Sequence, residues 1–186
     1  MDRGAFRLRF PGAQIERWAA RFCDPPDERV ERVVAERAKR QGYLRRPDFL
    51  HLCRWKTPRS RPNVEKNSEP FIAAVTATAF STPNERLRIE VLTLLEGVHW
   101  PTASVILHFG HREPYPILDV RALWSLGIDE PPAYRFPFWW EYTKTCRRLA
   151  DRYHCSMRVL DRALWQYAKE HQGLGRPARA RRGPPA

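Results

Sequence analysis

Long apolar runs and paired cysteines are both missing from this chain. No segment approaches the ~20 consecutive apolar residues that a membrane span requires. The four cysteines lie far apart and form no CxxC pair, which argues against a zinc site and predicts buried thiols in a reducing compartment. The N-terminus alternates charged with apolar residues and has no signal-peptide core. We therefore expect a soluble, cytoplasmic protein that does not bind membranes.

Acidic residues are scarce relative to basic ones. The chain has 33 Lys and Arg against 21 Asp and Glu, a formal net charge of +12. A soluble protein this basic usually meets a polyanion, and nucleic acid is the first candidate. The alternative is a charge that serves solubility and has no partner.

Strand signals are weak, whereas helical spacing runs through most of the chain. Residues 27–41 carry one apolar face, built from Val30, Val33, Val34 and Ala38, and Gly42 ends that helix. The other expected helices begin near Pro47, Ser68, Thr82, Pro101, Asp119, Phe138 and Ser156. Loops are expected at 57–63, 110–118 and 131–137. The pattern predicts a single all-α domain over residues 5–171, followed by a disordered basic tail over 172–186.

The most informative stretch covers residues 92–127, LTLLEGVHWPTASVILHFGHREPYPILDVRALWSLG. One expected helix ends in the residues LEGV, 95–98, and Thr102 and Ala103 stand in the first turn of the next. An apolar stretch then ends at Asp119, just before a further helix. This pattern resembles the helix-hairpin-helix DNA glycosylases, the superfamily that includes endonuclease III and the adenine and oxoguanine glycosylases.

The resemblance implies that the hairpin binds the phosphate backbone of double-stranded DNA. Backbone N–H groups at the start of a helix independently favour a phosphate. The residues assigned to DNA contact in this way are Gly97, Val98, His99, Trp100 and Thr102. Family members often hold a monovalent cation on hairpin carbonyls, and the matching positions are Thr93, Leu95 and Val98. No other cofactor is expected, because the closely spaced C-terminal cysteines of the iron–sulphur members are missing.

Asp119 occupies the position of the family's catalytic aspartate. Breaking an N-glycosidic bond builds positive charge on the sugar, which a fixed carboxylate stabilises while it orients the attacking water. The resemblance therefore implies a DNA glycosylase of base-excision repair that releases a flipped base. An ordinary helix N-cap is the alternative reading of Asp119, and the two roles are compatible.

Two residues depart from the family pattern. Pro101 stands where bifunctional members carry a Schiff-base lysine, which favours a monofunctional enzyme that uses water. His99 replaces the second glycine of the hairpin, and its side chain either hinders or adds to nucleic-acid contact. This second departure favours an alternative function, a non-catalytic nucleic-acid-binding module. A basic helical interaction protein that binds no nucleic acid is a third possibility.

A basic segment, residues 31–61, holds ten Lys or Arg against three acids. Within it, Lys56 and Arg59 follow Trp55, and cations beside an aromatic ring suit phosphate contact together with base stacking. Trp55 and Tyr115 are candidates for the base pocket, although aromatic residues are individually more common in cores. Lys56 is also a candidate nucleophile. We expect a monomer, and the sequence specifies neither the base nor the choice between DNA and RNA.

Overall fold

The computed structural model describes residues 6–22 and 29–173, and these residues form helices joined by turns and loops without any strand. The expected all-α architecture is therefore confirmed for this part of the chain. None of its helices has the length and apolar character needed to cross a membrane. The tail expected to be disordered lies outside the described residues from position 174 onward.

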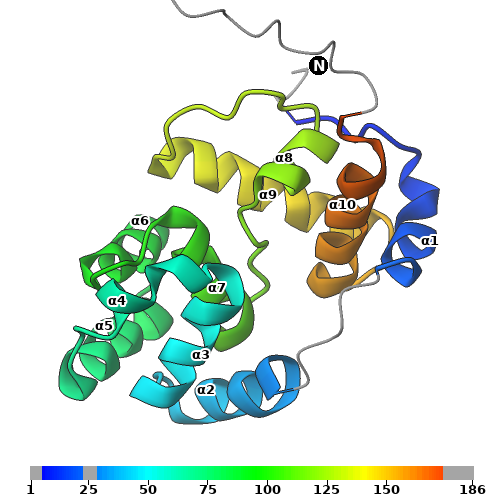
Figure 1. Cartoon of the computed structure of the whole chain (residues 1–186). Coiled ribbons are helices and arrows are strands. Elements are labelled where there is room, and N and C mark those ends of the chain that lie inside the picture. Colours follow the sequence, from blue (N-terminus) through cyan, green and yellow to red (C-terminus); the bar gives the residue numbers. More distant parts are fainter. Residues whose placement is uncertain (1–5, 23–28, 174–186) are drawn as a thin grey trace, which may run out of the picture.

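One group of helices, lower left in Figure 1, is built around α7 (Trp100–Gly110). Every α7 residue from 102 to 107 is buried, so this helix forms the centre of its group. The other members are η2 (Arg29–Val34), α2 (Ala35–Gln41), α3 (Arg46–Lys56), η3 (Pro58–Ser60), α4 (Arg61–Val64), α5 (Glu69–Ser81), α6 (Glu85–Glu90) and η4 (Val91–Leu94). Gly42 ends α2 in the left-handed conformation, as its position in the sequence predicted.

A second group, upper right in Figure 1, contains η1 (Gly12–Gln14), α1 (Ile15–Ala20), α8 (Val120–Ser125), α9 (Phe136–Arg152) and α10 (Met157–His171). Helix α10 packs against α1, α8 and α9. Its buried stripe includes Leu160, Ala163 and Leu164, at the spacing of one helix face. Ser156 caps this helix by accepting a hydrogen bond from the Val159 N–H.

Among the described residues, a chain segment and several contacts join the groups, including contacts between α6 and α9. The segment 111–119 leads from the end of α7 to the start of α8, and its residues 115–118 are buried. Glu31 of η2 forms ion pairs with Arg158 and Arg162 of α10, the second at 2.7 Å. Helix α10 also approaches α3, because the Arg158 guanidinium lies over the Trp55 ring.

Three local expectations were wrong. Residues 57–63 form η3 and most of α4 rather than a loop, because Pro58 and Pro62 stand in first turns, where the missing N–H costs nothing. Asn84, not Thr82, caps the helix that follows, and it accepts a hydrogen bond from the Leu87 N–H at 2.9 Å. Val33 is 47% exposed and does not belong to the apolar face of its helix.

Candidate functional site

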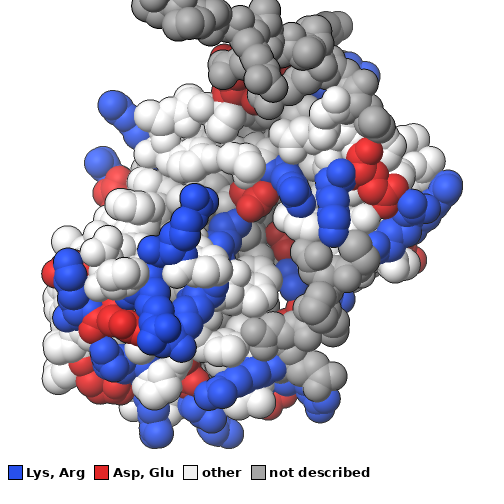
Figure 2. Space-filling model, in the orientation of Figure 1, with Lys and Arg blue, Asp and Glu red and all other residues white. Residues whose placement is uncertain are grey.

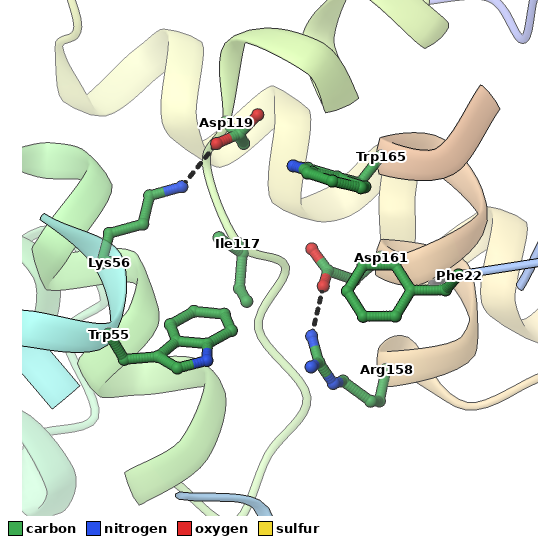
Figure 3. Close-up of a pocket in the computed structure, with 8 residues that line it drawn as sticks. All are labelled: Phe22, Trp55, Lys56, Ile117, Asp119, Arg158, Asp161 and Trp165. Atoms are coloured by element: carbon green, nitrogen blue, oxygen red, sulfur yellow. Dashed lines mark hydrogen bonds and ion pairs between the residues drawn. The ribbon is translucent and has the colours of Figure 1, made fainter. Parts of the chain in front are cut away.

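A cavity of about 250 Å³ opens where the two groups of helices meet. Helix α3 contributes residues from its C-terminal end, and α10 contributes residues from its first half (Figure 3). The lining residues are Phe22, Trp55, Lys56, Ile117, Asp119, Arg158, Asp161 and Trp165. Three of these, Trp55, Lys56 and Asp119, were expected from the sequence to be functional residues, and the fold brings all three to one place.

Asp119 is the N-cap of α8, and both of its carboxylate oxygens are engaged. Oδ1 accepts a hydrogen bond from the backbone N–H of Arg121 at 2.9 Å, which confirms the capping role. Oδ2 accepts one from Lys56 Nζ at 2.6 Å, in a pair whose side chains are 13% and 22% exposed. Burial raises the pKa of Asp119, but the Lys56 ammonium and the Arg121 N–H outweigh it and leave that pKa below its usual range. Asp119 is therefore ionised at neutral pH.

Asp161 is a second carboxylate in the same cavity. Its Oδ2 accepts a hydrogen bond from Arg158 Nη1 at 2.7 Å, one turn earlier on α10. The other oxygen is directed towards the middle of the cavity in Figure 3. Burial raises the pKa of Asp161 to about 6, although Arg158 and Lys56 act in the opposite direction.

Aromatic rings form two sides of the cavity. Trp55 lies beside Lys56 on one side, while Phe22 and Trp165 lie on the other, beside Asp161 (Figure 3). The rings of Phe22 and Trp165 meet edge to face, with centroids 5.3 Å apart. The Arg158 guanidinium lies 5.6 Å from the Trp55 ring centroid. Flat apolar walls around a few charged groups suit a small planar ligand.

The turn between η4 and α7 contains the residues assigned to DNA contact. Gly97 adopts a positive φ of 77°, as a tight turn requires. The side chains of Val98 and Thr102 are buried, and Trp100 is half-buried against the core. His99 is exposed and is thus the residue of this set whose side chain is freely accessible to a ligand.

The segment that follows α4 supports this turn from one side. The side-chain amide of Asn67 donates to the Glu96 carbonyl at 3.0 Å and accepts from the Glu96 N–H at 2.9 Å. A Cβ atom on Gly97 would lie 2.9 Å from Val64 Cγ1. The turn is therefore packed against α4 and the residues that follow it.

Basic side chains gather over the face that carries α3 and α4, and others lie over α8 and α10 (Figure 2). Arg59 is exposed between α3 and α4. On the α8 side, the Arg121 guanidinium lies 4.5 Å from the Trp165 ring centroid. Cations thus flank the cavity on both sides. Lys56 is not part of this exposed set, because its ammonium group is paired with Asp119 inside the cavity.

Tyr115 was expected in the base pocket and lies in the core instead. It is fully buried, its ring stacks on Trp139 with centroids 5.8 Å apart, and its hydroxyl donates to Glu85. Sequence reasoning missed Arg158, Asp161 and Trp165. Their spacing of three and four residues was a usable signal, because it places two charged residues beside the apolar stripe of one helix.

No protein-family model, curated protein or solved structure matches this chain. Within residues 6–22 and 29–173, no cluster of three His, Cys, Asp or Glu side chains could hold a metal ion. The side chains of the cavity supply an ionised carboxylate beside an ammonium group, and a second carboxylate whose pKa is about 6. These groups are suited to stabilising positive charge and moving protons.

Proposed function

We propose that the protein is a monofunctional DNA N-glycosylase that releases a base flipped out of double-stranded DNA. The observation that carries the proposal is the position of Asp119, an ionised carboxylate on the edge of a small cavity with aromatic walls. The sequence pattern supports it, because the spacing from the turn at Gly97 to Asp119 resembles that of the helix-hairpin-helix glycosylases.

In this reaction the bond between the sugar C1′ and the base nitrogen breaks, and positive charge develops on the sugar. The Asp119 carboxylate stabilises that charge and accepts a proton from the water whose oxygen bonds to C1′. The base leaves with the bonding electron pair and takes up a proton. Lys56 acts as a positioning residue, because its ammonium group holds one Asp119 oxygen in place and favours the ionised carboxylate.

DNA contact is assigned to the turn before α7 and to the exposed cations around the cavity. The N–H groups in the first turn of α7 have no partner within the helix and suit a phosphate. His99 and Arg59 are exposed near this turn and can contact the same backbone. A monovalent cation on the carbonyls of Thr93, Leu95 and Val98 stays a prediction, as do a monomeric state and a cytoplasmic location.

The second candidate is a non-catalytic nucleic-acid-binding module. The ion pair between Lys56 and Asp119 favours it, because each oxygen of the carboxylate already has a hydrogen-bond donor. In a module of this kind Asp119 would serve only to cap α8 and to join it to α3.

The test is base release from duplexes that each contain one modified base, scored before any strand cleavage. Asp119→Asn keeps an oxygen that can cap α8 but removes the charge, so base release should fall at least ~100-fold while DNA binding persists. Glu113→Gln is the matched control, because it removes an exposed carboxylate of the neighbouring loop and should leave the rate unchanged. Binding without release from any duplex, or release by Asp119→Asn at the wild-type rate, would favour the binding module.

A further inference from the structure

The cavity has two chemically different ends. At one end Asp119 is paired with Lys56, and at the other Asp161 is paired with Arg158 (Figure 3). The proposed reaction uses only the first end. The second end therefore needs an explanation, because a carboxylate that is nine-tenths buried is costly unless its hydrogen bonds are satisfied.

Arg158 fixes the orientation of Asp161. The guanidinium donates a hydrogen bond from Nε to Glu31 at 3.1 Å. It also donates one from Nη1 to Asp161 Oδ2 at 2.7 Å. Glu31 is itself held by Arg162 at 2.7 Å. Arg162, Glu31 and Arg158 thus form a connected network that holds one oxygen of Asp161. The position of the other oxygen is therefore also set before any ligand arrives.

Oδ1 is the second carboxylate oxygen of Asp161. Among the described residues it accepts no hydrogen bond, and Figure 3 shows it directed into the space between the aromatic walls. An ionised carboxylate oxygen accepts hydrogen bonds and cannot donate them. The occupant that completes this site is therefore a planar group with an N–H donor on its edge.

We propose that Asp161 selects the base, by accepting a hydrogen bond at Oδ1 from an amino group on the edge of a ring held between Trp55 and Trp165. This inference rests on the proposed function and deepens it to a substrate class, the amino-bearing bases and their modified forms. A carboxylate accepting from an amino edge is a known mode of base reading, and such contacts discriminate by ~1–3 kcal/mol. A base whose edge carries only a carbonyl oxygen would face a second acceptor and be repelled.

The size of the cavity agrees with this assignment. At about 250 Å³ it lies below the range of ~300–1,000 Å³ typical of pockets for larger ligands. It therefore takes a single base and leaves the sugar outside, beside Asp119. The selecting group and the reacting group then contact different parts of the same nucleotide.

The test is titration of the full chain with free bases, followed by nuclear magnetic resonance of the tryptophan indole N–H groups. Adenine is compared with purine, and cytosine with the pyrimidinone that lacks its amino group. The wild-type protein should bind the amino-bearing member of each pair about 10-fold more tightly, the factor that corresponds to ~1.4 kcal/mol. The signals of Trp55 and Trp165 should shift on binding.

Asp161→Asn sharpens the test, because Arg158 donates and will draw the amide oxygen towards itself. The amide NH₂ group then faces the cavity and replaces an acceptor by a donor. The preference for amino-bearing bases should disappear, and a carbonyl-bearing base such as hypoxanthine should gain affinity. Retained dispersion of the indole signals shows that the variant is folded.

Glu113→Gln is the matched control, since it removes an exposed carboxylate outside the cavity and leaves Asp161 and the residues that hold it unchanged. It should keep the amino preference. Equal binding of adenine and purine by the wild type, an unchanged preference in Asp161→Asn, or a lost preference in Glu113→Gln would each overturn the proposal. Base release from duplexes is scored separately. Selective binding without release refutes the glycosylase alone, and release without selective binding refutes Asp161 as the selecting group.

Discussion

At the residue scale, the two carboxylates of one cavity have pKa values shifted in opposite directions. Lys56 and the Arg121 N–H keep the pKa of Asp119 below its usual range despite burial. Burial dominates at Asp161 and raises its pKa to about 6. Carboxyl groups whose pKa values are separated in this way can perform different tasks at the same pH. In the scheme proposed here, Asp119 acts on the sugar and Asp161 contacts the base.

The separation of the two pKa values predicts a pH dependence of base preference. The charged groups that face or hold Asp161 are Arg158, Lys56, Asp119 and Glu31, and the pKa values of Asp119 and Glu31 are both lowered. Between pH 7 and 5, Asp161 is therefore the carboxylate of this set that takes up a proton. Because its raised pKa favours the protonated form as the pH falls through about 6, the preference for amino-bearing bases should weaken across that range.

Affinities for adenine and purine measured from pH 5 to pH 8 check this prediction. Their ratio should be constant above pH 7 and should fall towards one near pH 5. A ratio that does not change with pH would show that ionised Asp161 is not the acceptor. Asp161→Asn should show no transition, which separates this titration from effects on the bases themselves.

In the proposed enzyme, Lys56 has a different role from the lysine of bifunctional glycosylases. Its ammonium group donates to Asp119 at 2.6 Å, and a protonated amine cannot attack the sugar. Pro101 offers no amine at the family's usual position. We therefore expect no covalent adduct when the protein is treated with borohydride in the presence of a substrate duplex.

Electrophoresis of the trapped mixture provides the measurement. Lys56→Arg keeps the positive charge and removes the amine, so it is the control for any adduct that does appear. An adduct formed by the wild type and lost in Lys56→Arg would identify Lys56 as a nucleophile and would contradict the monofunctional assignment.

The sequence predicted part of this site. Asp119, Lys56 and Trp55 were identifiable because each stands in a local pattern, a helix start or a basic aromatic cluster. Tyr115 is an aromatic residue of the kind that lines base pockets. Its ring packs on Trp139, however, so it lies in the core. The spacing of Asp161 from Arg158 and Trp165 was visible in the sequence, but its role could not be assigned, because that role depends on the approach of α10 to α3, which no local pattern determines.

At the scale of single elements, the turn before α7 depends on a helix that the sequence suggested was a loop. Both prolines of residues 57–63 were interpreted as loop residues, although each stands in the first turn of a helix. The resulting α4 lies against Gly97 and leads into Asn67, whose side chain binds the backbone of Glu96. The turn is therefore shaped by tertiary contact as well as by its own glycine.

Two glycines with nearly the same φ isolate the contribution of this contact. Gly97 and Gly42 have φ values of 77° and 79°, but only Gly97 has neighbours within 4 Å of an added Cβ. Gly42→Ala should lower the free energy of unfolding by ~1–2 kcal/mol, the cost of a left-handed residue. Gly97→Ala should lower it by ~1–3 kcal/mol more, because the new methyl group also presses on Val64.

Chemical denaturation of the two variants measures the difference. Equal losses in both would mean that the turn and α4 do not press on each other. The same steric conflict makes substitutions at Gly97 unsuitable for testing DNA contact. His99→Glu is the better probe, because this side chain is exposed and a carboxylate there should repel phosphate without disturbing the core.

At the scale of the whole molecule, helical periodicity predicted the fold class and most helices, whereas the arrangement of the two groups was not predictable. The cavity exists because Trp55 of one group faces Trp165 of the other (Figure 3). This arrangement also determines where positive charge lies around the cavity. Cations lie on both sides of the cavity, with exposed Arg59 beside α3 and half-buried Arg121 on α8, so a nucleic-acid strand that crosses the opening would meet positive charge before and after it.

This distribution predicts that DNA binding depends on salt through both sides of the cavity. Each phosphate neutralised by the protein contributes ~0.9 to the slope of log K against log salt for duplex DNA. Arg59→Gln and Arg121→Gln should therefore each reduce the slope by about 0.9, and the double variant by about 1.8, on duplexes of any sequence.

Arg152→Gln is the control, because this exposed arginine lies at the end of α9, beside the Tyr153 ring that contacts Gly12. Its slope should equal that of the wild type. Asp119→Asn should also leave the slope unchanged, because in the proposed reaction that residue acts on the sugar, and it is paired within the protein. A slope that responds to Arg59 alone would place the strand along α3 and α4 and away from the cavity, and such a path could not deliver a base to Asp119.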